Sequence, residues 1–188
     1  MKGAKDKMHK DLDSILISEF QLEDIVSTLA DEINADYSDE EIIMIVILKG
    51  SVVFASDLMR KLKMPVNLEF MKASSYGLGT TSSKVVNVTL DIKTDIEGKN
   101  VLLVEDIVDS GNTLSNLKAM LLKRNPKTLK LCTLLDKPDR REAEIEPDYV
   151  GTIIPDEFVV GYGLDYAEDY RQLPYIGILS RSVYEVEK

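Results

Sequence analysis

The stretch VLLVEDIVDSGNTL, residues 101–114, joins an aliphatic run to a short polar turn and then to a helical pattern. Its first four residues are all apolar, without the alternation of a half-exposed strand, which is typical of a strand covered on both faces. After the turn, Leu114, Leu117 and Leu121 recur at helical spacing. The stretch therefore predicts a buried strand that passes through a tight turn into a helix.

Units of a strand followed by a helix recur along the chain. The run EIIMIVILKGS precedes a second helical pattern, for which Ser51 is a candidate N-cap, and Ser18 with Gln21 fits a capping box before an earlier helix. This alternation is typical of an α/β domain with a mainly parallel central sheet. We expect one helix over about 19–34, a second that follows Ser51 and ends before Pro65, and a third from about residue 113 that Asn125-Pro126 stops. We expect strands over about 41–49, 66–74, 84–92, 99–107 and 127–136.

Length and composition favour one domain, residues 1–188, and limit its partners. The 23 basic and 33 acidic residues give a formal net charge of −10, which repels nucleic acid and anionic membranes. No apolar window approaches the length of a membrane span, and the polar N-terminus has no signal-peptide core, so we expect a cytoplasmic protein. The only histidine, His9, lies in that N-terminal segment, which excludes a histidine-based catalytic triad.

Two further segments have a distinct composition. SSYGLGTTSSK, residues 74–84, is small and polar, and it fits either an exposed hairpin tip or a lid that closes over a ligand. The C-terminal third, from about residue 145 to 188, contains short apolar runs broken by Pro and Gly. We expect it to form a small subdomain appended to the sheet.

The acids Glu105, Asp106 and Asp109 stand where a ligand of an open α/β sheet binds, outside the carboxyl end of a strand. The turn at residues 110–113 opens a helix, whose first amide groups suit a phosphate. The acids have the wrong sign for a phosphate and suit sugar hydroxyls or Mg²⁺ instead. The alternative is that they only complement the helix dipole at a solvated strand end. Three acids behind one apolar strand favour a sugar-phosphate ligand with a metal.

The same stretch resembles the phosphoribosyl-diphosphate (PRPP) signature of type I phosphoribosyltransferases, in which apolar residues precede two acids and a D-[ST]-G-x-T turn. LKGS resembles the pyrophosphate loop of that family, SSYG its mobile catalytic loop, DKPDRR its 6-oxopurine segment and DEFVVGYGLDYAEDYRQLPYIGIL its hood over the base. Order and spacing are similar to the hypoxanthine-guanine phosphoribosyltransferase branch from about residue 12 onward. The resemblance implies a type I phosphoribosyltransferase fold, with a small hood that also includes the N-terminal segment.

The resemblance implies a role for each matching residue on the PRPP side. Glu105 and Asp106 would hold the ribose hydroxyls and Mg²⁺, Asp109 would be the catalytic base at N7 of the purine, and Arg171 would clamp pyrophosphate. Alone, Arg171 would be taken for a surface cation. The complete implied PRPP set is Glu105, Asp106, Ile107, Val108, Asp109, Ser110, Gly111, Asn112 and Thr113, with Lys49 and Gly50 for pyrophosphate and Ser75 and Tyr76 in the mobile loop.

Two further features concern the pyrophosphate loop. The family has a cis peptide before the lysine that matches Lys49. This chain has Ser51 where many members have a second glycine.

On the purine side, the resemblance implies that Lys137 donates to the 6-oxo group and that Phe158 stacks on the base. Val159 and Asp165 would serve the pyrimidine edge, and Asp165 would also be a candidate ligand for a second Mg²⁺. Without the resemblance, Lys137 would be taken for a solvated loop residue and Phe158 for a core aromatic.

The implied reaction transfers 5-phosphoribosyl from PRPP to N9 of hypoxanthine or guanine and yields IMP or GMP and pyrophosphate, with Mg²⁺ as cofactor. The family also implies a homodimer or homotetramer. Two alternatives stay open: a regulatory protein that keeps the PRPP fold and binds nucleic acid, and an enzyme that prefers another base. Lys137 disfavours adenine, whereas xanthine differs only at the 2-position.

Overall fold

The computed structural model describes residues 8–75 and 86–185. The elements in chain order are β1 (Leu12–Ile17), α1 (Glu19–Tyr37), β2 (Ile42–Ile47), α2 (Val52–Met59), β3 (Val66–Ser75), β4 (Val86–Leu90), β5 (Asn100–Val108), α3 (Asn112–Leu122), β6 (Thr128–Asp136), the 3₁₀ helix η1 (Pro138–Arg140), β7 (Tyr149–Ile153), β8 (Val159–Val160), β9 (Ile176–Leu179) and α4 (Arg181–Tyr184). One sheet has the order β4-β3-β2-β5-β6-β7 and the other β1-β9-β8.

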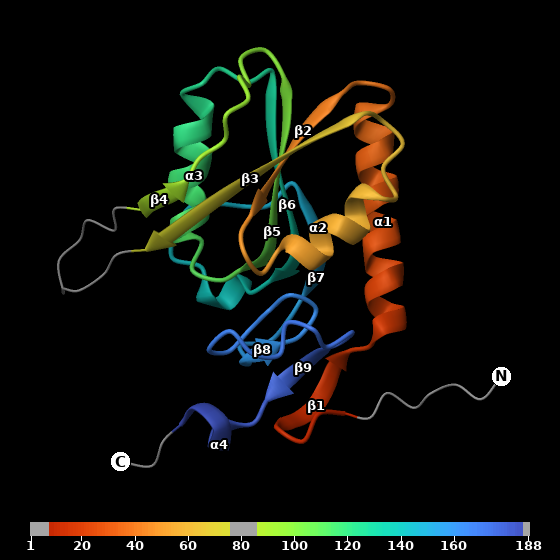
Figure 1. The fold of residues 1–188 in the computed structure, drawn as a ribbon, viewed down its shortest axis with the longest axis vertical. Helices are drawn as coiled ribbons and strands as arrows, with labels where there is room; N and C mark the ends of the chain where they lie inside the picture. The colour runs from red at the N-terminus through yellow and green to blue at the C-terminus, as the bar shows by residue number, and fades with distance from the viewer. Residues whose placement is uncertain (1–7, 76–85, 186–188) are drawn as a thin grey trace.

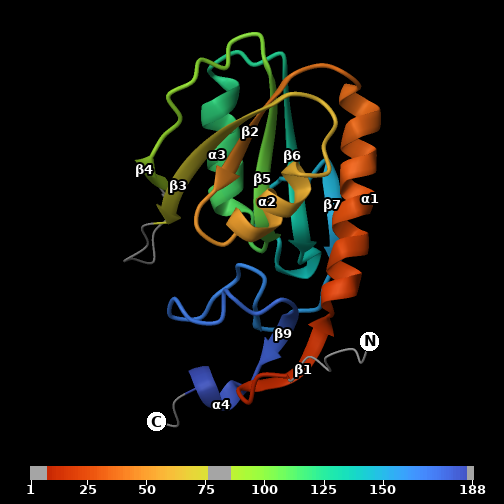
Figure 2. The ribbon, with the colours of Figure 1, turned by 45° about the vertical axis from the view of Figure 1, so that its right-hand side comes forward.

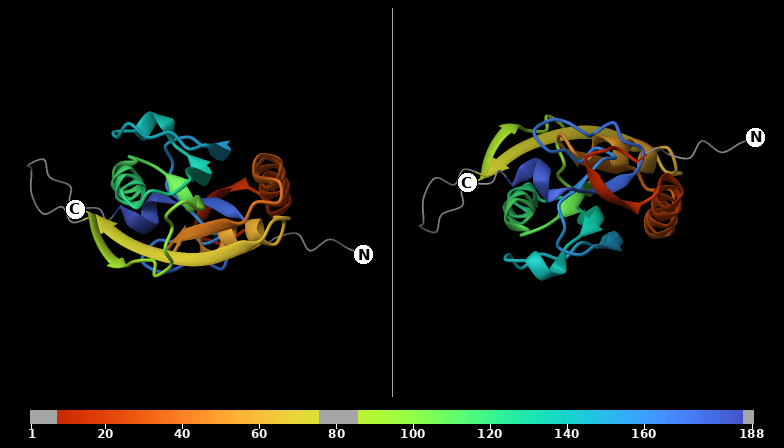
Figure 3. Two further views of the ribbon diagram at one scale, coloured as in Figure 1. Left: turned by 90° about the horizontal axis from the view of Figure 1, so that it is seen from above. Right: turned by 90° about the horizontal axis from the view of Figure 1, so that it is seen from below.

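The six-stranded sheet is parallel except at one edge. β2, β3, β5, β6 and β7 run parallel, whereas the carboxyl half of β3 pairs antiparallel with β4. Figure 3 shows β3 curving along one side of the molecule with β4 beside its carboxyl end. The predicted α/β class with a mainly parallel sheet is confirmed.

Helices cover both faces of the central sheet, as the unbroken aliphatic sequence of β2 predicts. Met44 and Val46 pack into a core with α1 and α2, whereas Ile43 and Ile45 pack into a second core with α3. Side chains alternate between the faces of a strand, so one continuous aliphatic run supplies both cores. Figure 2 shows α1 and α3 on opposite sides of the strands.

The predicted helices are present, but α2 ends at Met59, several residues before Pro65. The helix expected over 19–34 extends to Tyr37, and its capping box is confirmed, because the amides of Ser18 and Gln21 each donate to the other's side chain. The three leucines of the predicted helical face of α3 are buried. None of the helices in the described part of the chain combines the length and apolar character that a membrane span needs.

The three-stranded sheet lies at one end of the central sheet (Figure 1). β1 and β8 both pair antiparallel with β9, which joins the N-terminal segment to the C-terminal one. We refer to β1, β8, β9 and the chain between β8 and β9 as the hood. β7 falls in the range expected for the appended subdomain, yet it pairs in parallel with β6 as the edge of the central sheet.

The predicted loop at residues 74–84 begins at the end of β3, which reaches Ser75. Tyr76 and residues 77–84 lie outside the described residues.

Candidate active site

The end of β5 is the meeting point of several segments. β5 pairs with β2 only as far as Val104, whereas its pairing with β6 continues to Val108. β2 ends at Ile47, and the chain that follows turns against the free edge of β5. Glu105 and Asp106 therefore lie within a strand, facing the turn at residues 48–51.

Ser51 connects this turn to β5. Its side chain is fully buried, and its Oγ donates to Glu105 Oε1 at 2.9 Å and accepts from the Asp106 amide at 3.1 Å. Ser51 is the N-cap residue of α2, as predicted, but its hydroxyl makes no capping hydrogen bond. The hydroxyl turns instead toward the buried carboxylate, which is the stronger acceptor. Ser51 thus holds Glu105 in place.

Gly50 allows the turn to approach Asp106 closely. A Cβ atom at residue 50 would lie 1.6 Å from Asp106 Oδ2, so no other residue fits without moving that carboxylate. The other carboxylate oxygen, Oδ1, accepts from the Ile107 amide at 2.7 Å. The Leu48–Lys49 peptide is cis, as the resemblance implies.

Glu105 and Asp106 form a pair of like charges. Burial is the main cause that raises the pKa of both carboxyls, and the pKa of Glu105 is raised further by the charge of Asp106. The hydrogen bond from Ser51 opposes the rise at Glu105, and the charge of Arg171 opposes it at Asp106. Such a pair favours a ligand that supplies hydroxyl donors or positive charge.

The donor chemistry of this pair suits Mg²⁺, which commonly binds one or two carboxylates together with oxygens of a substrate. In residues 8–75 and 86–185, no group of three or more His, Cys, Asp or Glu side chains is placed to hold a metal ion. Glu105, Asp106 and Asp165 thus do not form one preformed metal site.

The turn after β5 is shaped for an anion. Gly111 has φ of +77°, and a Cβ atom there would lie 2.6 Å from Ile145 Cγ2, so glycine is required on both counts. α3 begins at Asn112, and the first amides of a helix have no partners within it. The amides of residues 142–143 donate to the Ser110 carbonyl at 2.9 and 3.1 Å and hold the turn in place.

This turn borders a hollow of about 290 Å³, which we call the acidic hollow. It is lined by Ile47, Leu48, Gly50, Ala73, Glu105, Asp106, Ile107, Asp109, Ser110, Gly111, Thr113 and Leu114. Most of the predicted PRPP residues thus lie together, whereas Val108 is buried in the core beside α3 and Lys49 does not line this hollow. Asn112 adjoins them, with its amide nitrogen donating to Ser110 Oγ at 3.2 Å.

A second hollow of about 470 Å³, the aromatic hollow, lies between the central sheet and the hood. It is lined by Ile107, Asp109, Lys137, Arg140, Asp156, Glu157, Phe158, Val159, Leu164, Asp165 and Tyr184. The rings of Phe158 and Tyr184 stack with centroids 5.0 Å apart and planes at 27°. Ile107 and Asp109 line both hollows, which therefore adjoin.

Two cations face the aromatic hollow. Lys137 is only 8% exposed, and its Nζ donates to the Glu157 carbonyl at 2.6 Å. Arg140 Nε lies 2.8 Å from Asp109 Oδ1, and its Nη1 lies 3.4 Å from Asp156 Oδ1. We did not predict Arg140 or Tyr184 from sequence. Arg140 lies in DKPDRR, whereas no sequence pattern pointed to Tyr184.

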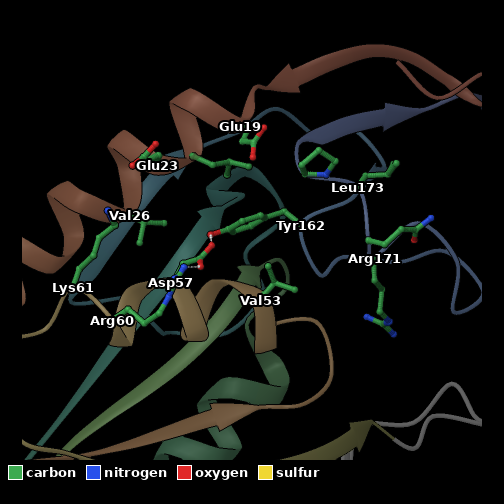
Figure 4. Close-up of a pocket in the computed structure, with 13 residues that line it drawn as sticks. Glu19, Glu23, Val26, Val53, Asp57, Arg60, Lys61, Tyr162, Arg171 and Leu173 are labelled. Atoms are coloured by element: carbon green, nitrogen blue, oxygen red, sulfur yellow. Dashed lines mark hydrogen bonds and ion pairs between the residues drawn. The ribbon is translucent and has the colours of Figure 1, made fainter. Parts of the chain in front are cut away.

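Arg171 belongs to the hood and reaches toward β5. Its Nη2 lies 2.8 Å from Asp165 Oδ1, and its Nη1 donates to the Gly163 carbonyl at 2.7 Å. Figure 4 shows the guanidinium extending away from a neighbouring groove between α1 and α2, where the Tyr162 hydroxyl donates to Asp57 at 2.6 Å. Arg171 also lines this groove, but its charge opposes the rise that burial causes in the pKa of Asp106 on β5.

Comparisons with known proteins agree with this geometry. The sequence model of the phosphoribosyl transferase domain matches residues 16–167. The hypoxanthine-guanine phosphoribosyltransferase of Staphylococcus epidermidis is 48% identical over 177 residues, which cover 94% of this chain and 99% of the relative. A crystal structure of a hypoxanthine phosphoribosyltransferase from Staphylococcus aureus matches with a TM-score of 0.92 and 44% identity, covering 98% of this chain and all of that chain.

A longer relative matches as well. The bifunctional protein TilS/HprT of Listeria monocytogenes is 47% identical over 182 residues, and the match covers 97% of this chain but only 28% of that protein. The family model matches most of the chain, and the similar sequences and the similar crystal structure are also phosphoribosyltransferases. The chain therefore belongs to the phosphoribosyltransferase family and has its type I fold.

Proposed function

We propose that this protein transfers 5-phosphoribosyl from PRPP to N9 of hypoxanthine or guanine, forming IMP or GMP and pyrophosphate. One observation carries the proposal: the acidic hollow and the aromatic hollow adjoin and share Asp109. A sugar phosphate in the first hollow and a planar base in the second would meet beside that carboxylate. The names and coverage of the relatives support the same reaction.

In the acidic hollow, the amides and hydroxyls of residues 110–113 hold the 5′-phosphate at the start of α3. Glu105 and Asp106 accept hydrogen bonds from the ribose hydroxyls and would hold Mg²⁺. Mg²⁺, when bound, neutralises charge on the pyrophosphate group. Lys49 and Arg171 meet the remaining pyrophosphate oxygens. A bound cation and these hydroxyls would relieve the repulsion between the two buried carboxylates.

In the aromatic hollow, the base stacks on Phe158. Lys137 donates to the 6-oxo group, which disfavours adenine because its 6-amino group is itself a donor. Val159 and Asp165 face the pyrimidine edge, and Asp165 is also a candidate ligand for a second Mg²⁺. Asp109 lies where the two substrates meet and accepts the proton from N7.

During the reaction, the bond from the anomeric carbon to pyrophosphate breaks, and a bond from that carbon to N9 forms. The sugar passes through an oxocarbenium-like state, as in glycosyl transfer generally. Asp109 takes the proton that the purine loses, and pyrophosphate leaves with the electron pair of the broken bond. The chain supplies position and charge, and it forms no covalent intermediate.

An assay with PRPP, Mg²⁺ and each of hypoxanthine, guanine, xanthine and adenine tests the proposal. We expect nucleotide and pyrophosphate in equal amounts with hypoxanthine and guanine, and no turnover with adenine or without PRPP. The yield with xanthine ranks it among the 6-oxopurines. Absence of turnover with all four bases, together with tight, salt-sensitive RNA binding on filters, would identify a nucleic-acid-binding regulator instead.

A further inference from the structure

The two cations assigned to pyrophosphate share one acidic partner. Lys49 Nζ donates to Glu168 Oε2 at 2.8 Å, and Arg171 Nη2 lies 3.4 Å from the same oxygen. Lys49 follows β2, whereas the other two residues belong to the hood. One carboxylate oxygen thus joins two cations that come from distant parts of the sequence.

The backbone fixes this arrangement. Gly163 has φ of +102°, and a Cβ atom there would lie 2.1 Å from the Gly50 carbonyl oxygen, so the hood turn rests directly on the turn after β2. The Glu168 amide donates to Asp165 Oδ2 at 2.9 Å. Arg171 is held by Asp165 and by the Gly163 carbonyl. The Glu168 side chain therefore extends from an ordered turn, and its position beside Lys49 follows from that turn.

The ion pairs themselves are open to solvent. The side chains of Lys49 and Glu168 are 50% and 64% exposed, and the hydrogen bond from Lys49 lowers the pKa of Glu168. Exposed ion pairs contribute little to folding stability. A carboxylate in such a pair can be replaced by a more highly charged anion at small cost. Pyrophosphate is an anion of this kind.

We propose that Glu168 is an internal counter-ion that occupies the anion site of Lys49 and Arg171 until a pyrophosphate group displaces it. The inference rests on the proposed function, because that function assigns these cations to pyrophosphate. Glu168 holds the two cations together in the free protein. It competes with the pyrophosphate group of bound PRPP, and it also competes with the pyrophosphate that the reaction releases. This competition favours product release.

Calorimetric titration with pyrophosphate and Mg²⁺ tests the proposal. We expect Glu168→Gln to bind pyrophosphate roughly three- to fivefold more tightly than the wild type, because the competing charge is gone. Asp169→Asn is the matched control, since it removes the same charge from the next residue, which is exposed and pairs with neither cation in the described contacts. We expect its affinity to stay within about twofold. In the enzyme assay, product inhibition by pyrophosphate should strengthen in Glu168→Gln alone.

A third variant separates failure of this inference from failure of the proposed function. Lys49→Met should weaken pyrophosphate binding. If it does, and Glu168→Gln binds with unchanged or lower affinity, the counter-ion role is wrong while the pyrophosphate site stands. If Lys49→Met leaves the affinity unchanged, the anion site is wrongly assigned, and the role of Glu168 fails with it.

Discussion

The acidic hollow and the aromatic hollow adjoin, but the chain assembles them differently. Most of the acidic hollow comes from one continuous segment, residues 105–114, at the end of β5. The aromatic hollow combines residues from β5, the end of β6, η1, the hood and α4. A site built from one segment leaves a motif in the sequence, whereas a site collected from distant segments leaves single residues with no local pattern.

The two hollows also differ in electrostatics. In the acidic hollow, burial raises the pKa of both Glu105 and Asp106, and the charge of Asp106 raises the pKa of Glu105 further. In the aromatic hollow, Asp109 and Asp156 both lie beside Arg140. The negative charge in the acidic hollow thus depends on a ligand for its compensation, whereas Arg140 compensates the two carboxylates in the aromatic hollow.

Asp109 is shared by both hollows, so its substitution should have the largest effect. We expect Asp109→Asn to lower kcat about 10²- to 10⁴-fold, because the variant removes the proposed proton acceptor but keeps the size of the side chain. Steady-state kinetics measures this. Asp139→Asn, an exposed acid on η1, is the control with the same change in charge. Forward activity of Asp109→Asn within twofold of the wild type would show that Asp109 is not the base.

Phe158→Ala should separate the two hollows. Loss of aromatic stacking on a base costs about 1–3 kcal/mol, so KM for hypoxanthine should rise roughly tenfold to a hundredfold while KM for PRPP stays unchanged. Phe20→Ala, at a side chain 78% exposed on α1, is the matched control. An equal rise of both KM values would mean that the hollows do not bind their substrates independently.

Lys137→Met should change specificity with a smaller effect on turnover. Met keeps most of the length of the side chain at a position that is 8% exposed, but it removes the donor that we propose for the 6-oxo group. We expect the ratio of kcat/KM for hypoxanthine to that for adenine to fall roughly tenfold. Lys63→Met, on the exposed surface, should leave the ratio unchanged. An unaltered ratio in Lys137→Met would place the discrimination elsewhere.

The same difference between the hollows explains what could be predicted from sequence. The apolar runs predicted the central sheet, because strands buried on both faces need continuous aliphatic residues. Residues 105–113 alone predicted a sugar-phosphate site with a metal. The roles of Lys137 and Phe158 came only from family resemblance.

Ser51 was correctly predicted at the N-cap of α2, but the partner of its hydroxyl was not predicted, because Glu105 is 54 residues away in sequence. Local rules compare neighbours and therefore favour a helix cap. Tyr184 was missed for a similar reason, because its contact with Phe158 depends on how α4 folds back onto the hood.

The central claim is that Glu105 and Asp106 are placed in β5 to bind a ligand, although their burial lowers the folding stability of the free protein. The folded-state pKa of Glu105 is raised, so the unfolded chain loses this proton first as pH rises. The free energy of unfolding therefore falls as pH rises above the usual pKa of a glutamate, about 4.3. In Glu105→Gln this loss is absent, and the Ser51 hydroxyl still has an acceptor.

The most direct measurement is therefore the free energy of unfolding of Glu105→Gln without ligand, together with its affinity for PRPP in the presence of Mg²⁺. We predict a variant that is more stable than the wild type by about 0.5–2 kcal/mol at pH 8 and by less at pH 5, with PRPP affinity reduced about tenfold or more. A variant that is less stable at both pH values and binds PRPP as tightly as the wild type would contradict the claim.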